Sequence, residues 1–250
     1  MRRSPFLRLA IRCALGAAAI GFACVAYAYL TLPDVRSLKT TNPGTTAFIE
    51  LRASEARAKG RTPRRVQQWV GYGRISADLK RAVLVAEDDA FWQHEGIDLE
   101  QIEQSMEIDW ARGRIARGAS TITQQLAKNL YLSPSRNPLR KWRELIIARR
   151  LEVELSKQRI LELYLNVIEW GDGVYGAEAA ARTYCHTSAS ALGPTDAALL
   201  AGAIVNPRVL NPARPTERLV RRQQLILQRM GAVPPPADAI GTSDRVGGPL

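Results

Sequence analysis

An uncharged run near the N-terminus constrains this chain more than any other feature. The run has twenty residues, from Cys13 to Leu32, and as a helix it would span roughly 30 Å, the thickness of a bilayer core. Four arginines precede it, and no acidic residue occurs before Asp34. The positive-inside rule then predicts a cytoplasmic basic segment at residues 1–12, a transmembrane anchor at residues 13–32 and an exported remainder.

A cleaved signal peptide is the alternative, because Ala26-Tyr27-Ala28 resembles a small-x-small cleavage site. Both interpretations export the rest of the chain. The formal net charge of +11 favours an anionic partner: nucleic acid, a membrane surface or a phosphate-bearing substrate. Export argues against nucleic acid, so we expect a membrane surface or an anionic substrate.

Cysteine and histidine are too scarce for several kinds of site. Cys13 and Cys24 lie in the uncharged run, which leaves Cys185 alone in the exported part. No disulfide framework and no cysteine-based metal site can be built from one cysteine. His94 and His186 are the two histidines, so a zinc site or a Ser-His-Asp triad is poorly supplied. We therefore assign no metal-ligating residues.

Helical signals dominate after the lead-in and predict a mainly α fold. Residues 33–64 are expected to be a linker and lead-in, residues 65–230 one folded domain, and residues 231–250 a disordered tail. Alternating strand patterns are scarce. The first expected helix has Ser76 as its N-cap and apolar spacing through Ala90, and a second starts at Ser120. A third begins at Asn137-Pro138 and runs toward Ser156, and a fourth segment covers residues 157–166. Thr195 and Thr216 are the expected caps of two final helices, the last of which ends before Gly231.

Three consecutive acids, Glu87-Asp88-Asp89, end the first of these helical runs. Acids in the last turn of a helix oppose the macrodipole by roughly 0.3–1 kcal/mol each, so a helix break with solvated acids is the plain interpretation. Phe91 and Trp92 follow at once, however, and a carboxylate beside apolar surface gains proton affinity suited to acid–base work.

Two further stretches carry polar residues at helical spacing. In residues 118–129, adjacent glutamines and Lys128 form a donor-rich strip suited to pyrophosphate or sugar hydroxyls, although an ordinary amphipathic helix capped by Ser120 also explains it. Arg140 and Glu144 are four residues apart, which by itself predicts a solvated ion pair. In residues 157–166, Ile160, Leu161 and Tyr164 are expected in the core, with Glu162 and Asn166 unexplained by packing.

Together these stretches resemble the glycosyltransferase 51 family, in particular its monofunctional peptidoglycan transglycosylases. The matching motifs are EDxxFxxHxG at 87–96, GxSTITQQ at 118–125, RKxxE at 140–144 and KxxILExYLN at 157–166, followed by GVYGAEAAARTY and ALLAGAIVNP. The resemblance covers roughly residues 65–230. Ala119 and the Cys185-His186 pair depart from the family pattern. No Ser-x-x-Lys or Lys-Thr-Gly of a penicillin-binding domain occurs.

The resemblance implies a lysozyme-like helical domain that polymerises lipid II with inversion and releases undecaprenyl pyrophosphate. It implies Glu87 as general base and Glu144 as a second carboxylate that orients cations or balances charge. The substrate-binding residues that it implies are Asp88, Ser120, Gln124, Gln125, Lys128, Arg136, Arg140 and Lys141. Metal ligands are not implied, no cofactor is required, and there is room for a divalent cation.

The implied partners are lipid II, undecaprenyl-pyrophosphate-linked glycan and the inner membrane, with the domain on the extracytoplasmic side, and there is room for partner proteins of cell-wall synthesis. Two other classes stay open. A lytic hydrolase of similar fold would use Glu87 as an acid, but would have little use for clustered cations and would usually place Ser after the Glu, where this chain has Asp88. A non-catalytic membrane-tethered scaffold would tolerate a neutral replacement of Glu87.

Overall fold

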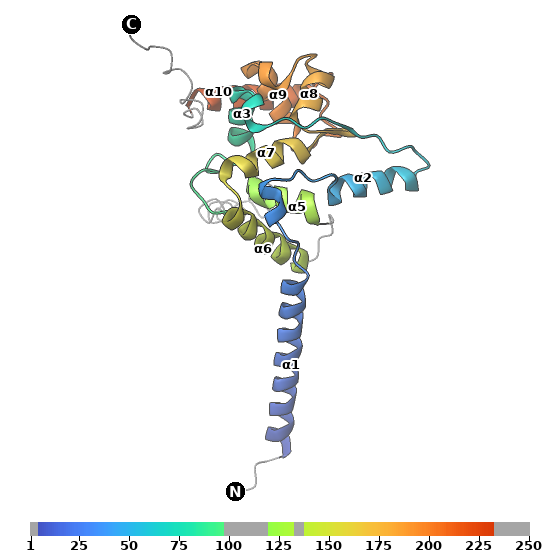
Figure 1. Cartoon of the computed structure of the whole chain (residues 1–250), viewed down its shortest axis with the longest axis vertical. Coiled ribbons are helices and arrows are strands. Elements are labelled where there is room, and N and C mark those ends of the chain that lie inside the picture. Colours follow the sequence, from blue (N-terminus) through green and yellow to red (C-terminus); the bar gives the residue numbers. More distant parts are fainter. Residues whose placement is uncertain (1–4, 98–119, 133–137, 233–250) are drawn as a thin grey trace. The chain divides into compact units, whose positions relative to one another are not determined.

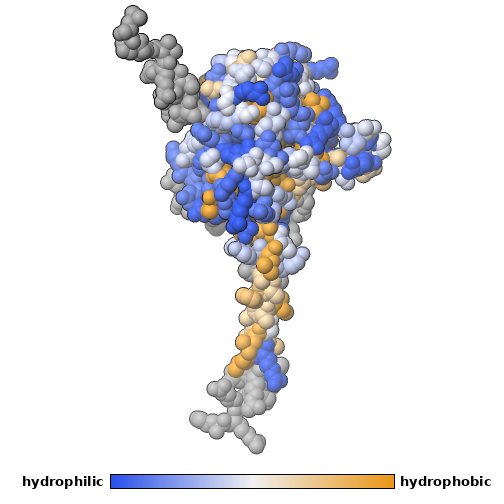
Figure 2. Space-filling view, in the orientation of Figure 1, coloured by the Kyte–Doolittle hydropathy of each residue, from blue (hydrophilic) through white to orange (hydrophobic). Residues whose placement is uncertain are grey.

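The computed structural model describes residues 5–97, 120–132 and 138–232, and it divides the chain into two compact units, Met1–Asp34 and Val35–Leu250. The first unit is built on helix α1, Pro5–Leu30. Figure 2 colours most of the surface of α1 hydrophobic, with hydrophilic atoms near its N-terminal end. Within the described parts of the chain, no helix has both the length and the apolar character needed to cross a membrane. The predicted transmembrane anchor is thus not confirmed.

The second unit is mainly helical, as the sequence predicts. Its helices are α2 (Ala47–Ala58), α3 (Ala77–Glu87), α5 (Ile122–Tyr131), α6 (Pro138–Glu154), α7 (Lys157–Val167), α8 (Ala177–Tyr184), α9 (Pro194–Ala203) and α10 (Glu217–Ala232), with 3-10 turns at Arg36–Lys39, Tyr72–Arg74 and Ala189–Ala191. Helix α5 lies between α6 and α7, and α3 packs against α9 and α10 (Figure 1).

A small sheet joins distant parts of this unit. Its strands are β1 (Val66–Gln67), β2 (Glu169–Gly171) and β3 (Val174–Tyr175), in the order β1-β3-β2. Strand β1 runs parallel to β3, with Val66 opposite Val174, and β2 runs antiparallel to β3. The β2–β3 hairpin therefore holds the lead-in segment against the end of α7.

The core forms where apolar stripes of α3, α5 and α7 meet. Ile122 and Leu126 of α5 and Leu161 of α7 are fully buried, as is Leu79 of α3. Burial of such a side chain contributes about 1.5–3 kcal/mol. The helix α5 is therefore fixed on the side away from its glutamines, which leaves those glutamines to line a site.

The predicted linker contains a helix that the sequence interpretation missed. Thr46 caps α2 by accepting a hydrogen bond from the Ile49 backbone N–H at 3.1 Å, and Ile49 is buried. The helix ends where Gly60 adopts a φ of +66°, a left-handed conformation that glycine adopts at little cost. Prolines and glycines on both sides made the whole range resemble an unstructured lead-in.

Several predicted helix ends need correction, whereas Ser76, Pro138 and Thr216 lie at helix starts as expected. Helix α5 is capped by Thr121 and not by Ser120. Helix α9 starts at Pro194 after Gly193, so Thr195 is no cap. Gly231 lies inside α10, and most of the predicted tail falls outside the described residues.

Candidate active site

The first feature of the site is the end of α3. The helix stops at Glu87 because Asp88 leaves helical geometry, with φ −167° and ψ 81°. The predicted continuation through Ala90 is therefore wrong, and Asp89 does not lie on the same helix as Glu87. Asp89 forms an exposed ion pair with Arg229 of α10 at 2.7 Å. The three acids thus have three different environments, although they are adjacent in sequence.

The carboxylate of Glu87 is held through one of its own two oxygen atoms. Its Oε2 accepts a hydrogen bond from the Gln125 side-chain amide at 3.0 Å, and its Oε1 accepts none from the residues that the structure describes. Burial raises the pKa of Glu87, and the charge of Asp88 adds to that rise. Gln125, Arg222 and Lys128 oppose the rise but do not cancel it. The carboxylate is therefore oriented, more basic than an exposed Glu, and has one oxygen left for a substrate proton.

Tyr164 fixes the orientation of the Gln125 amide. Its hydroxyl lies 2.9 Å from Gln125 Oε1, while Gln125 Nε2 faces Glu87. An ionised carboxylate only accepts hydrogen bonds, so the amide must present its NH₂ to Glu87 and its oxygen to the tyrosine. Tyr164 is fully buried, and burial together with the nearby charges of Glu87 and Asp88 raises its pKa well above the usual value. The hydroxyl thus keeps its proton and donates it to Gln125.

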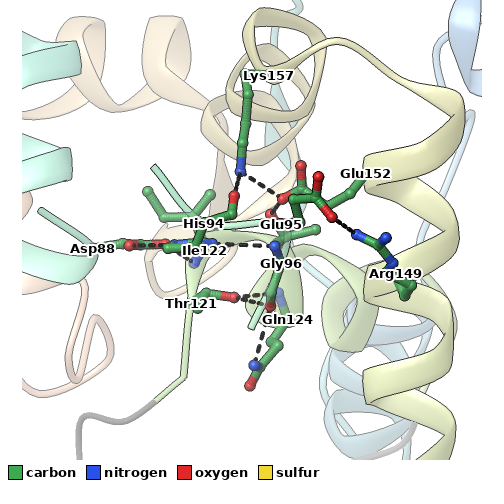
Figure 3. A network of polar contacts seen from close by, with 11 residues as sticks. Asp88, His94, Glu95, Gly96, Thr121, Ile122, Gln124, Arg149, Glu152 and Lys157 are labelled. Carbon is green, nitrogen blue, oxygen red and sulfur yellow. Dashed lines mark hydrogen bonds and ion pairs between the residues drawn. The ribbon is translucent and has the colours of Figure 1, made fainter. Parts of the chain in front are cut away.

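Asp88 is a buried connector between α3 and α5 (Figure 3). Its Oδ2 accepts the backbone N–H of Ile122, the first residue of α5, at 2.8 Å. Its Oδ1 lies 2.9 Å from His94 Nε2. Since the Gly96 backbone N–H donates to His94 Nδ1, the neutral ring must carry its proton on Nε2 and donate it to Asp88. The first-turn N–H at Ile122 is therefore occupied by protein.

Gly96 ties the same loop to α5. Its carbonyl accepts hydrogen bonds from the Thr121 hydroxyl at 2.8 Å and from the Gln124 amide at 3.2 Å (Figure 3). Gly96 has a φ of +85°, and a Cβ atom there would lie 2.9 Å from Glu152 Cγ. Glycine is thus required on two grounds: its conformation and the close approach of α6.

Lys157 completes this network from α7. Its ammonium donates to the His94 carbonyl at 2.6 Å and to Glu152 Oε1 at 2.8 Å, and it lies 4.5 Å from the centre of the Phe91 ring (Figure 3). The ammonium therefore links the first and fourth motifs. Residues 88–97 are held from three helices, which positions the end of α3 against the start of α5.

A second cluster forms around Lys141 of α6. Its ammonium lies 2.5 Å from Glu144 Oε1, 3.0 Å from Gln124 Oε1 and 3.4 Å from Ser120 Oγ. The other oxygen of Glu144 accepts a hydrogen bond from Arg140 at 2.7 Å. Glu144 is buried, with both oxygens bound to cations, so its geometry supports an orienting role. Five of the predicted site residues therefore meet in one cluster.

Lys128 lies between the two clusters. Burial lowers its pKa, the neighbouring Arg140 and Lys141 lower it further, and the charges of Glu144 and Glu87 oppose the shift. In the described part of the chain its ammonium makes no hydrogen bond or ion pair. The carboxylates of Glu87 and Glu144 are thus both close enough to act electrostatically on Lys128, a half-buried cation that has no fixed partner among the described residues.

A cleft of about 250 Å³ opens beside these groups. Gln125, Lys128, Asn129 and Tyr164 line one side, and residues 204–207 line another. Arg52 of α2 also reaches the cleft, where its guanidinium stacks on Phe48 at 4.5 Å. The cleft is therefore bounded partly by the helix that the sequence interpretation missed.

Most of the predicted site residues come together in this way, and Arg136 lies outside the described residues. Two residues that act on Glu87 were not predicted as functional: Tyr164, expected only as core, and Arg222 of α10. Tyr164 could have been found from its place in the fourth motif. No sequence signal identified Arg222. Within the described residues, no group of three or more His, Cys, Asp or Glu could hold a metal ion.

Comparison with known proteins places the chain in a family. A model of the Transglycosylase family matches residues 55–231, a range that begins inside α2. A protein named biosynthetic peptidoglycan transglycosylase from Dechloromonas aromatica (strain RCB) is 52% identical over 195 residues, or 78% of this chain and 84% of the relative. Another of that name, from Methylobacillus flagellatus, is 49% identical over 189 residues, or 76% and 82% of the two chains. The chain is a member of the transglycosylase family.

Proposed function

We propose that the chain is a peptidoglycan glycosyltransferase that joins lipid II units into β-1,4-linked glycan, with Glu87 as the general base. The family and the names of the relatives support the reaction class. The observation that carries the mechanism is the state of Glu87: its pKa is raised, one oxygen is held by Gln125, and the other has no protein partner among the described residues.

In the proposed step, the 4-hydroxyl of one lipid-linked unit attacks the anomeric carbon of the growing glycan. A carbon–oxygen bond forms there while the bond from that carbon to the pyrophosphate breaks, and its electron pair leaves with the phosphate. The hydroxyl proton goes to Glu87 Oε1. Attack from the side opposite the leaving group inverts the anomeric carbon, and a positioned base contributes about 10²–10⁴-fold to the rate.

The leaving pyrophosphate needs neutralisation of its charge, and the cations of the second cluster suit it. Lys128 has no fixed partner in the described structure, and Arg140 offers a planar fork of donors held in place by Glu144. Lys141, Ser120 and Gln124 extend the same surface. A hydrolase of similar fold would have little use for this surface, which favours transfer.

We place this reaction at the extracytoplasmic face of the inner membrane, with residues 13–32 as the attachment. The support comes from the sequence: the run is uncharged, four arginines precede it, and a helix forms over Pro5–Leu30. A substrate with a lipid tail also requires an enzyme that works at a membrane surface.

Incubation of the detergent-solubilised full chain with labelled lipid II tests the proposal, with products separated by size. Polymer longer than the starting disaccharide is expected. A parallel incubation with preformed glycan separates the alternatives: shortening of that glycan without growth on lipid II would replace the transferase with a hydrolase.

A further inference from the structure

A second cavity, of about 90 Å³, lies beside the cleft and takes no part in the proposed reaction. Four segments line it: the C-terminal half of α2, residues 61–64, the β2–β3 hairpin and Arg208. Its lining is strongly charged, and some of these charges have partners within the protein while others do not.

The acids of the cavity are paired within the protein. Glu55 pairs with Arg52 at 2.9 Å and with Arg208 at 3.4 Å. Glu169 is buried and accepts from Arg52 at 3.1 Å, and Asp172 pairs with Arg208 at 3.2 Å. Each of the three acids is therefore paired with one or both of the two arginines, and this group has one negative charge in excess.

Three further cations line the cavity without such partners. We call Lys59, Arg61 and Arg64 the rim cations. In the described parts of the chain none of their side chains makes a hydrogen bond or an ion pair. All three are exposed, so each is solvated and free to turn toward a bound anion. The cavity thus carries an excess of positive charge at its mouth.

One residue of the cavity lining carries an unpartnered hydroxyl. Tyr175 is 1% exposed, and its hydroxyl has no hydrogen-bond partner among the described residues. Burial raises the pKa of Tyr175 and the charge of Glu169 adds to the rise, so the phenol keeps its proton. A buried donor without an acceptor destabilises the free protein, and a bound acceptor would remove that penalty.

The cavity is adjacent to the cleft. Arg52 and Glu169 line both spaces. A molecule bound in the cleft can therefore extend a charged group into the cavity, and this favours the substrate over a separate ligand such as a membrane lipid. Peptidoglycan carries a peptide on its glycan, and such a peptide bears carboxylates.

We infer that this cavity binds a carboxylate of the peptide carried by the glycan, with the Tyr175 hydroxyl as donor and the rim cations as neutralising charges. The inference rests on the proposed function for the identity of the substrate. It adds a recognition site for the peptide, separate from the groups that act on the sugar and the pyrophosphate.

The test measures equilibrium binding of a soluble disaccharide-peptide to the detergent-solubilised full chain. A second probe is the same molecule with its carboxylates converted to amides. Tyr175→Phe is expected to weaken binding of the acid probe about tenfold and to leave the amide probe unchanged. Because the lost hydroxyl is unpartnered in the free protein, the melting temperature should stay the same or rise. Weaker binding of the acid probe without a fall in melting temperature would indicate that Tyr175 acts in binding and not in stability.

Arg61→Gln with Arg64→Gln is expected to weaken the acid probe by up to about fivefold per cation. Arg57→Gln is the matched control, since Arg57 is an exposed arginine of α2 that does not line the cavity, and it should change nothing. Equal binding of both probes, or unchanged binding by Tyr175→Phe, would overturn the inference. Binding of the variants to vesicles of anionic lipid is measured in parallel. Variants that bind these vesicles more weakly but still bind the acid probe normally would also overturn the inference, in favour of a membrane contact. Failure of wild-type protein to polymerise lipid II would refute the proposed function and leave this binding test intact.

Discussion

Replacement of Tyr164 by Phe is the most informative perturbation of the site, because it removes one hydroxyl whose hydrogen bond reaches Glu87 only through Gln125. The hydroxyl donates to Gln125 Oε1 at 2.9 Å, and the other end of that amide donates to Glu87 at 3.0 Å. Without the tyrosine donor, only a 3.3 Å hydrogen bond from Gln125 Nε2 to the Ser120 carbonyl opposes, among the described residues, a rotation that presents the amide oxygen to Glu87. Two acceptors would then face each other.

The size of the effect follows from the bond at risk. A hydrogen bond to a charged group contributes about 1.5–3 kcal/mol, and one pKa unit corresponds to about 1.4 kcal/mol. Partial loss of the Gln125 bond should therefore raise the pKa of Glu87 by roughly one further unit. Because the base must be deprotonated, the acid limb of the pH–rate profile should move to higher pH by the same amount. Below that limb the rate should fall about tenfold.

The assay is the initial rate of lipid II polymerisation across pH, with a thermal melt to detect unfolding. The same substitution in a Gln125→Leu background should leave the acid limb unmoved, because the effect acts through that amide. A Tyr164→Phe protein with an unshifted limb would refute the reasoning. An equal shift in the Gln125→Leu background would show that the tyrosine acts by another route.

Three further predictions concern the acids and the anchor. Glu87→Gln should reduce the polymerisation rate by at least about two orders of magnitude in a folded protein, whereas Asp89→Asn, at an exposed ion pair, should reduce it far less. Separation of the products by size measures both rates. Near-wild-type turnover by Glu87→Gln would remove the proposed mechanism. Asp88→Asn should lower the free energy of unfolding by about 1–3 kcal/mol, since an amide cannot accept from both buried donors; unchanged denaturant midpoints would contradict that. Residues 13–32 should remain attached, and N-terminal sequencing of membrane-extracted protein would disprove this by finding a mature start near Tyr29.

The sequence predicted the site where the relevant signals are local. Lys141 and Glu144 are one helical turn apart, and Gln124 and Gln125 are adjacent, so their motifs placed them correctly on two helices. The pKa of Glu87 is raised by burial, the direction expected for a carboxylate beside apolar surface. The mainly α class followed from the same helical periodicity.

The rest depended on contacts between distant segments. Arg222 lies 135 residues after Glu87, and only the packing of α10 on α3 brings its charge near. The choice of Thr121 over Ser120 as the cap of α5 was settled by bonds to Gly96 and Asp88, which no local pattern encodes. Helix α2 was missed because turn-forming residues flank it on both sides.

The position of α10 bears on where a minimal active fragment can end. This helix appears peripheral in the chain, since it is the last described element, yet Arg222 lowers the pKa of Glu87 and Arg229 pairs with Asp89 just after it. A fragment that stops before Glu217 would keep every motif residue and still lose the cation that favours the ionised base. It would also lose the buried Leu219, Ile226 and Met230, so the end of α3 that carries Glu87 depends on this last helix for both packing and electrostatics.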